Sequence, residues 1–132
     1  MSTPRRPATV ALVVWTLLVW TTRISNIWND DALSEGEKWG RTGLAMSFTV
    51  LAVGAAVAVW RRSGWQRQVV VALGAWTIAV WVVRAVGIAT GDHDAAFIVV
   101  HLVLAVVSIA LSALAVREGA RADRPLAAAA DR

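Results

Sequence analysis

The sequence predicts an all-α membrane protein in which four transmembrane helices form one bundle. Hydrophobic residues make up 58% of the 132 residues and the mean hydropathy is +0.59, which is too high for a soluble domain of this length. Each apolar segment is close to the roughly 20 residues that cross a hydrocarbon core about 30 Å thick. The four predicted spans are residues 8–28, 42–60, 69–90 and 95–116.

The first and third spans are copies of one sequence. The segment VALVVWTLLVWTTRISNI at 10–27 returns 61 positions later as VALGAWTIAVWVVRAVGI at 71–88, with nine of 18 residues identical. Since a returning span follows each copy, the repeated unit is a two-helix hairpin, the first at about 8–61 and the second at about 67–117. Two tandem hairpins with the same orientation predict a bundle with an approximate two-fold axis along the membrane normal.

The charged residues predict how the bundle is oriented. Arginines precede the first span, fill the second loop and follow the fourth span: Arg5, Arg6, Arg61, Arg62, Arg67, Arg117, Arg121 and Arg124. The other two loops are acidic: Asp30, Asp31, Glu35, Glu37, Asp92 and Asp94. The positive-inside rule therefore predicts that both termini are cytoplasmic. The richness in Ala, Val and Arg with a single lysine indicates a bacterial chain, and hence the bacterial inner membrane.

Several helix ends can also be predicted. Ser34 followed by Glu37 is a capping box, so the second helix is expected to begin near residue 35, outside the membrane. Gly91 suits the end of the third helix, and Asp92 or Asp94 suits the start of the fourth. Residues 118–132 mix charge with alanine and predict a flexible cytoplasmic tail, so residues 1–132 are one membrane domain with a short extension.

Arg23 and Arg84 are the most informative polar residues because they occupy the same position of the repeat. At about 1.5 Å per residue they lie about 20 Å from the inner boundary, in the outer third of the hydrocarbon core. A charged side chain at the bilayer centre costs about 2.5–3.5 kcal/mol on insertion scales. Three explanations remain open. In the first, each arginine extends outward to lipid phosphates or to the acidic loops. In the second, the pair converges on a carboxylate, a phosphate or a lipid head group, and in the third the arginines bond to a partner subunit.

Other side chains are expected near the arginine layer. His101 and Ser47 fall at a similar depth, and Trp20 and Trp81 lie at matched depth within the repeat. For these residues packing is the simpler role, and contact with a ligand is the alternative. A weak candidate for a divalent cation site, for which a solvated acidic loop is the simpler interpretation, consists of Asp92, His93 and Asp94.

Composition excludes several classes of function. The chain has no cysteine, which excludes disulfides, thiolate metal sites and thiol redox chemistry. No predicted span holds an Asp or Glu at depth, which argues against a proton-coupled antiporter. The arginines follow the loops rather than forming a patch, so we expect no nucleic-acid partner. No nucleophile and base can be assembled, so we expect neither an enzyme nor a cofactor.

The sequence therefore favours a non-enzymatic accessory, structural or interaction subunit embedded in the lipid bilayer. A row of small residues on the second helix is expected to pack within the bundle or to form the seam of a homodimer or of a complex with another membrane protein. Its members are Gly36, Gly40, Gly43, Ser47 and Gly54. The alternative function is binding or transport of an anionic small molecule or lipid head group through Arg23, Arg84 and His101.

Overall fold

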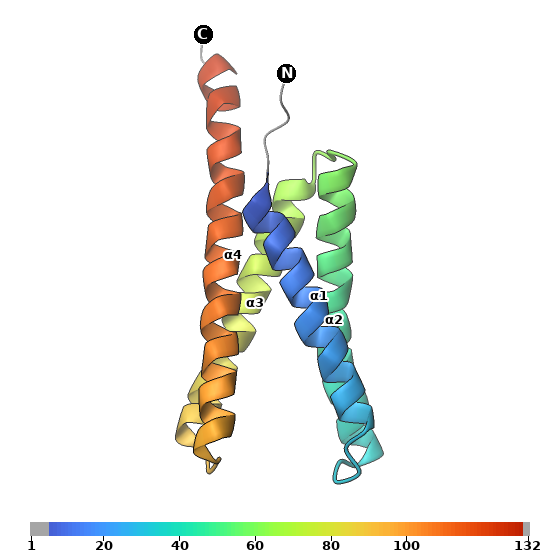
Figure 1. Ribbon diagram of the computed structural model, residues 1–132. Helices are drawn as coiled ribbons and strands as arrows, with labels where there is room; N and C mark the ends of the chain where they lie inside the picture. The colour runs from blue at the N-terminus through green and yellow to red at the C-terminus, as the bar shows by residue number, and fades with distance from the viewer. Residues whose placement is uncertain (1–5, 131–132) are drawn as a thin grey trace.

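The computed structural model describes residues 6–130, except for the side chains of 125–127 and 130, and within this range it contains only helices and short connections. Each of the four helices is long and apolar enough to cross a membrane, which confirms the four-helix prediction. The helices are α1 (Pro7–Trp28), α2 (Glu35–Trp60), α3 (Gln66–Thr90) and α4 (Ala95–Ala130). α1 begins and α4 ends at the same end of the molecule (Figure 1).

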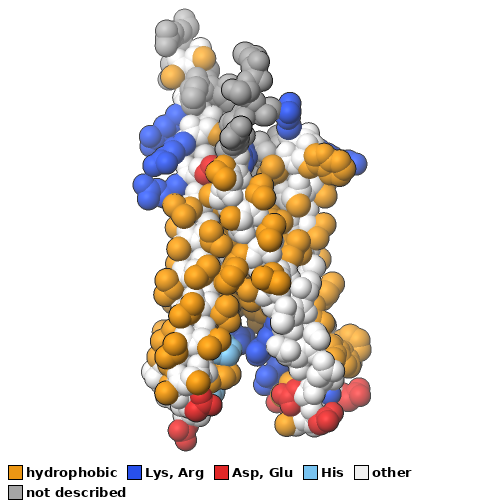
Figure 2. Space-filling view, in the orientation of Figure 1, with side chains coloured by type: hydrophobic (Ala, Val, Ile, Leu, Met, Phe, Trp, Pro, Cys, Tyr) orange, Lys and Arg blue, Asp and Glu red, His pale blue; other side chains and the backbone are white. Residues whose placement is uncertain are grey.

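The helices form a ring in which each one packs against its neighbours along the chain, and α1 also packs against α4. The α1–α2 pair and the α3–α4 pair lean apart toward the loops at 29–34 and 91–94 (Figure 1). A space-filling view shows the resulting gap at that end, with Lys or Arg and His side chains inside it (Figure 2). The other end of the bundle is held together by direct contacts.

The start of α1 depends on a side chain from α4. Arg6, which precedes the helix, makes no side-chain capping bond, and Pro7 has no backbone N–H. The backbone N–H groups of Ala8 and Thr9 instead donate to the carboxylate of Glu118, at N–O distances of 3.1 and 3.0 Å. The hydroxyl of Thr9 donates to the same carboxylate at 2.8 Å. Glu118 therefore supplies the cap that the sequence around α1 lacks.

Here the prediction for the C-terminal segment was wrong in part. We expected a fourth span at 95–116 followed by a flexible tail at 118–132, but the helix α4 continues to Ala130; of this segment, residues 131–132 lie outside the described residues. Alanine and arginine are strong helix formers, so the segment extends the helix once Glu118 has fixed it against α1.

The predicted helix ends elsewhere are confirmed. Ser34 accepts the backbone N–H of Glu37 and the Glu37 side chain accepts the backbone N–H of Ser34, which is a complete capping box at the start of α2. Gly91 ends α3. Asp94 accepts the backbone N–H of Phe97 at 2.8 Å and so caps α4.

The buried positions recur along the chain at a nearly constant spacing. The six buried positions of α1 are 9, 12, 13, 16, 20 and 27, and the six of α3 lie 61 positions later at 70, 73, 74, 77, 81 and 88. Buried positions 45, 48, 52 and 55 of α2 recur 60 positions later in α4 as 105, 108, 112 and 115. Corresponding helices of the two hairpins therefore turn corresponding faces inward.

Glycines play different parts in the two hairpins. A Cβ atom built on Gly74 would lie 2.9 Å from Cγ2 of Val116, so α3 and α4 approach closely only because this residue has no side chain. By contrast, Gly36, Gly40 and Gly43 would meet no atom within 4 Å. The expectation that these three pack within the bundle was wrong, because α2 leans away from the second hairpin at that end. A seam with another chain stays a prediction.

Candidate functional site

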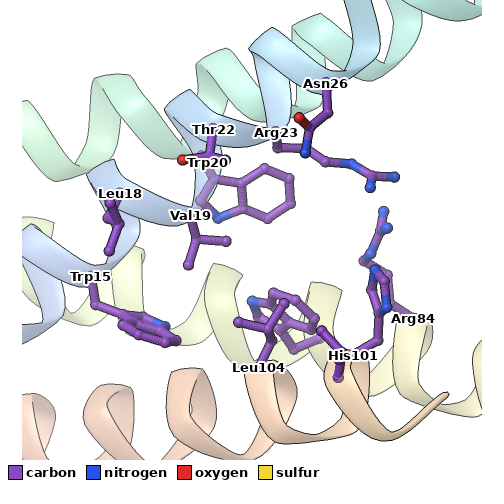
Figure 3. Close-up of a pocket in the computed structure, with 12 residues that line it drawn as sticks. Trp15, Leu18, Val19, Trp20, Thr22, Arg23, Asn26, Arg84, His101 and Leu104 are labelled. Atoms are coloured by element: carbon purple, nitrogen blue, oxygen red, sulfur yellow. The ribbon is translucent and has the colours of Figure 1, made fainter. Parts of the chain in front are cut away.

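A cleft of about 370 Å³ lies between α1, α3 and α4, in the half of the bundle where the hairpins separate. Its polar and aromatic lining comes from Trp20, Arg23 and Asn26 of α1, Trp81 and Arg84 of α3, and His101 of α4 (Figure 3). The volume falls within the range of about 300–1,000 Å³ that is typical of small-molecule sites. Five of the six site residues predicted from sequence line this cleft.

The side chains of Arg23 and Arg84 extend toward each other across the cleft (Figure 3). The one ion pair among the described residues joins Arg67 to Asp123 at 3.4 Å, so neither cleft arginine forms an ion pair with a carboxylate within 6–130. The Nε atom of Arg84 is buried and has no hydrogen-bond partner among these residues. Two like charges that face each other without acceptors repel, and this repulsion grows as the surroundings become less polar.

His101 is oriented by the preceding turn of α4. Its Nδ1 atom lies 2.8 Å from the carbonyl oxygen of Phe97, and the two rings stack with centroids 3.9 Å apart. Because a carbonyl oxygen can only accept, Nδ1 carries the hydrogen and Nε2 is left free for another partner. Asn26, one turn beyond Arg23, adds an amide to the same cleft. The rim can therefore donate from two guanidinium groups and one amide.

The inner wall of the cleft is aromatic and fixed in position. Trp20 and Trp81 are 4% and 3% exposed, and their ring centroids are 6.3 Å apart. Trp20 also stacks on the fully buried ring of Phe48, with centroids 4.1 Å apart and planes within 9°. Trp20 is thus packed between two aromatic rings, and the buried pair forms an aromatic surface below the arginines.

Ser47 is not part of the cleft, and its predicted place in the arginine layer was wrong in this respect. Its hydroxyl donates to the carbonyl of Leu44 at 2.6 Å and accepts the indole N–H of Trp76 at 3.0 Å. Trp76 lies eight residues before Arg84, about 12 Å along α3 at a rise of about 1.5 Å per residue, and α2 contributes nothing to the lining of the cleft. A matching hydrogen bond joins α1 to α4: Trp15 Nε1 donates to Ser108 Oγ at 2.9 Å.

The weak metal candidate at residues 92–94 is not supported. Asp94 is engaged in capping α4, and the ring of His93 stacks on Phe97 with centroids 4.7 Å apart. Across the part of the chain that the structure describes, no three His, Asp or Glu side chains are placed to hold a metal ion. The acidic loop is open to solvent, as the simpler interpretation expects.

Sequence reasoning missed Asn26 and the apolar part of the lining, which includes Leu18, Val100 and Leu104. Asn26 lies three residues after Arg23 and so on the same side of α1, which was the available indication. Nothing in an apolar transmembrane sequence distinguishes a valine that lines a cleft from one that faces lipid.

No protein family, curated protein or solved structure matches this chain. The fold and the cleft therefore define the protein by class alone: an all-helical chain with four helices able to span a membrane and a cationic, aromatic cleft between its two hairpins.

Proposed function

We propose that this protein is a four-span membrane protein of the non-enzymatic type that binds an anionic group between Arg23 and Arg84. The observation that carries the proposal is the pair of guanidinium groups that face each other over a cleft, with no carboxylate of the described residues at ion-pairing distance from either. Arginine pairs of this kind suit carboxylate and phosphate oxygens, which accept two parallel hydrogen bonds from each guanidinium. A bound anion would replace repulsion with two attractive contacts.

The surface supports placement in a membrane. Large apolar side chains are exposed on the outer surfaces of all four helices, including Val14, Val50, Val83 and Val106. Charged side chains gather at the two ends of the visible face, while apolar ones cover its middle (Figure 2). A surface of this kind is unfavourable in water and matches a lipid environment.

The orientation that we propose has both termini in the cytoplasm of a bacterial cell. Arg61 and Arg62 connect α2 to α3 at the end where α1 begins, and the two loops at the opposite end carry Asp30, Asp31, Asp92 and Asp94. The positive-inside rule then directs the cleft outward, into the outer half of the inner membrane.

We also propose that the bundle has an approximate two-fold axis along the membrane normal. The recurrence of buried positions at 60 or 61 residues supports this symmetry. Two reciprocal bonds support it further: Trp15 of the first hairpin donates to Ser108 of the second, and Trp76 of the second donates to Ser47 of the first. An axis of this kind brings equivalent residues together between the hairpins, and Arg23 and Arg84 are equivalent.

The test is anion binding by purified protein in an uncharged detergent. Two probes, inorganic phosphate and dodecyl phosphate, are titrated separately while the unfolding temperature is followed, with sodium chloride matching the ionic strength. We expect at least one probe to stabilise the protein in a saturable way. Arg23→Lys and Arg84→Lys keep the charge but lose the planar donor geometry, so each should weaken binding about tenfold.

Arg61→Leu removes a charge from the opposite end of the bundle and is the control, for which unchanged binding is expected. Saturable binding that persists in the double variant Arg23→Leu, Arg84→Leu would refute the proposal. Failure of both probes to bind the native chain would refute it equally.

A further inference from the structure

The cleft does not end at the arginines. It continues along α1 and α4 past Leu18 and Leu104 as far as Trp15. From Arg23 to Trp15 the distance along α1 is about 12 Å, at a rise of about 1.5 Å per residue. The polar groups Arg23, Asn26 and His101 therefore lie at one end of the cleft, and its other end is apolar. An occupant that satisfies both ends must itself be amphiphilic.

The cleft opens sideways between α1 and α4. Leu18 on α1 and Val100 on α4 line the cleft, yet they are 60% and 56% exposed. In a membrane such side chains face lipid tails, so the wall of the cleft is continuous with the hydrocarbon region. A molecule already dissolved in the bilayer can enter by this route without crossing the aqueous rim.

The polar end favours a doubly charged head group. Two guanidinium groups face each other there, and no acidic side chain lines the cleft. A phosphate monoester carries a charge of about −1.5 to −2 at pH 7 and has three oxygens to accept hydrogen bonds. A phosphodiester carries one charge and leaves one guanidinium uncompensated, and a zwitterionic head group adds a cation to a site that already holds two.

We propose that the cleft binds a lipid phosphomonoester from the outer half of the bilayer, with its phosphate between Arg23 and Arg84 and its hydrocarbon chain along the groove between α1 and α4. This inference rests on the proposed function, and it adds the chemical class of the ligand and its lateral route of entry. Trp20 and Trp81 would lie at the boundary between head group and chain, where their rings meet the first methylene groups.

The experiment uses the full chain in nanodiscs of phosphatidylcholine. Separate samples contain a small fraction of phosphatidic acid, which is a monoester, or of phosphatidylglycerol, which is a diester, and a third receives inorganic phosphate in the buffer. The unfolding temperature is measured against the content of each probe. We expect phosphatidic acid to bind at least fivefold more tightly than phosphatidylglycerol, and inorganic phosphate to bind at least tenfold more weakly than phosphatidic acid.

Two matched variants of α4 test the groove. Val100→Trp places a large ring beside His101 in the lipid-facing wall of the cleft, where it would obstruct the lateral entry route, and should weaken the effect of phosphatidic acid at least tenfold. Val106→Trp adds the same ring to a residue that is exposed and does not line the cleft, so it should leave binding unchanged.

The two proposals fail in different ways. If inorganic phosphate binds as well as phosphatidic acid, in an arginine-dependent manner, and Val100→Trp has no effect, the lipid inference is overturned and the anion site stands. If phosphatidylglycerol binds as tightly as phosphatidic acid, the preference for a monoester is overturned. If phosphatidic acid stabilises the Arg23→Leu, Arg84→Leu variant as well as the native chain, both proposals fail.

Discussion

Removing the Glu118 carboxylate should loosen the contact between the first and last helices of the bundle. This carboxylate accepts three hydrogen bonds, from the backbone N–H groups of Ala8 and Thr9 and from the Thr9 hydroxyl. A hydrogen bond to a charged group contributes about 1.5–3 kcal/mol, and losing an ordinary N-terminal cap costs about 1 kcal/mol. The three bonds share one carboxylate and are not additive, so we expect Glu118→Ala to lower the free energy of unfolding by about 2–3 kcal/mol.

Two further variants separate capping from charge. Glu118→Gln keeps one acceptor oxygen but turns an amide donor toward the N–H groups, so a loss of about 1 kcal/mol is expected. Asp123→Ala, on the same helix, removes the partner of Arg67 from an exposed ion pair and should cost less than about 0.5 kcal/mol. The assay is unfolding in mixed micelles by increasing sodium dodecyl sulfate, followed by tryptophan fluorescence. If Glu118→Ala is as stable as Asp123→Ala, the capping argument is wrong.

Three other predictions concern packing, the reciprocal bonds and topology. Gly74→Ala should be less stable than Gly87→Ala by about 1–3 kcal/mol in the same assay. Both substitutions gain equally in helix propensity, but only Gly74→Ala would push a methyl group against Val116. Equal stability of the two variants would contradict the close approach of α3 and α4. A double-mutant cycle of Trp15→Phe and Ser108→Ala should give a coupling free energy of about 0.5–1.5 kcal/mol, and additive losses would show that the bond contributes nothing. Reporter fusions should be active outside the cell at residues 32 and 93 and inactive at 64 and 125, and activity at 64 would reverse the proposed orientation.

Features encoded locally were predictable from sequence. The apolar length of each segment predicts a helix, and the capping box at Ser34 and Glu37 needs only residues three apart. The repeat itself identified Arg23 and Arg84, since a costly residue present twice at one position is informative even without coordinates.

Features that depend on the rotation of one helix against another were not predictable. Counting residues from a predicted span boundary placed Ser47 in the layer of the arginines. In the structure its hydroxyl accepts the indole N–H of Trp76, which lies eight residues before Arg84 on α3. Glu118 and Thr9 are separated by 109 positions, and an acidic residue in an alanine-rich segment does not indicate a partner at that distance. Both errors come from non-local packing, which propensity and hydropathy do not describe.

The reciprocal tryptophan–serine bonds also have a consequence for the ancestry of the chain. Each bond joins one hairpin to the other, so a single hairpin on its own would leave an indole N–H without its serine acceptor. Two copies of one hairpin, in contrast, could satisfy each other in the way the halves of this chain do. Under the two-fold symmetry that we propose, the bundle has the form of a homodimer joined into one chain, which is what duplication of a hairpin would produce. In such a homodimer a single arginine position would supply both sides of the cleft.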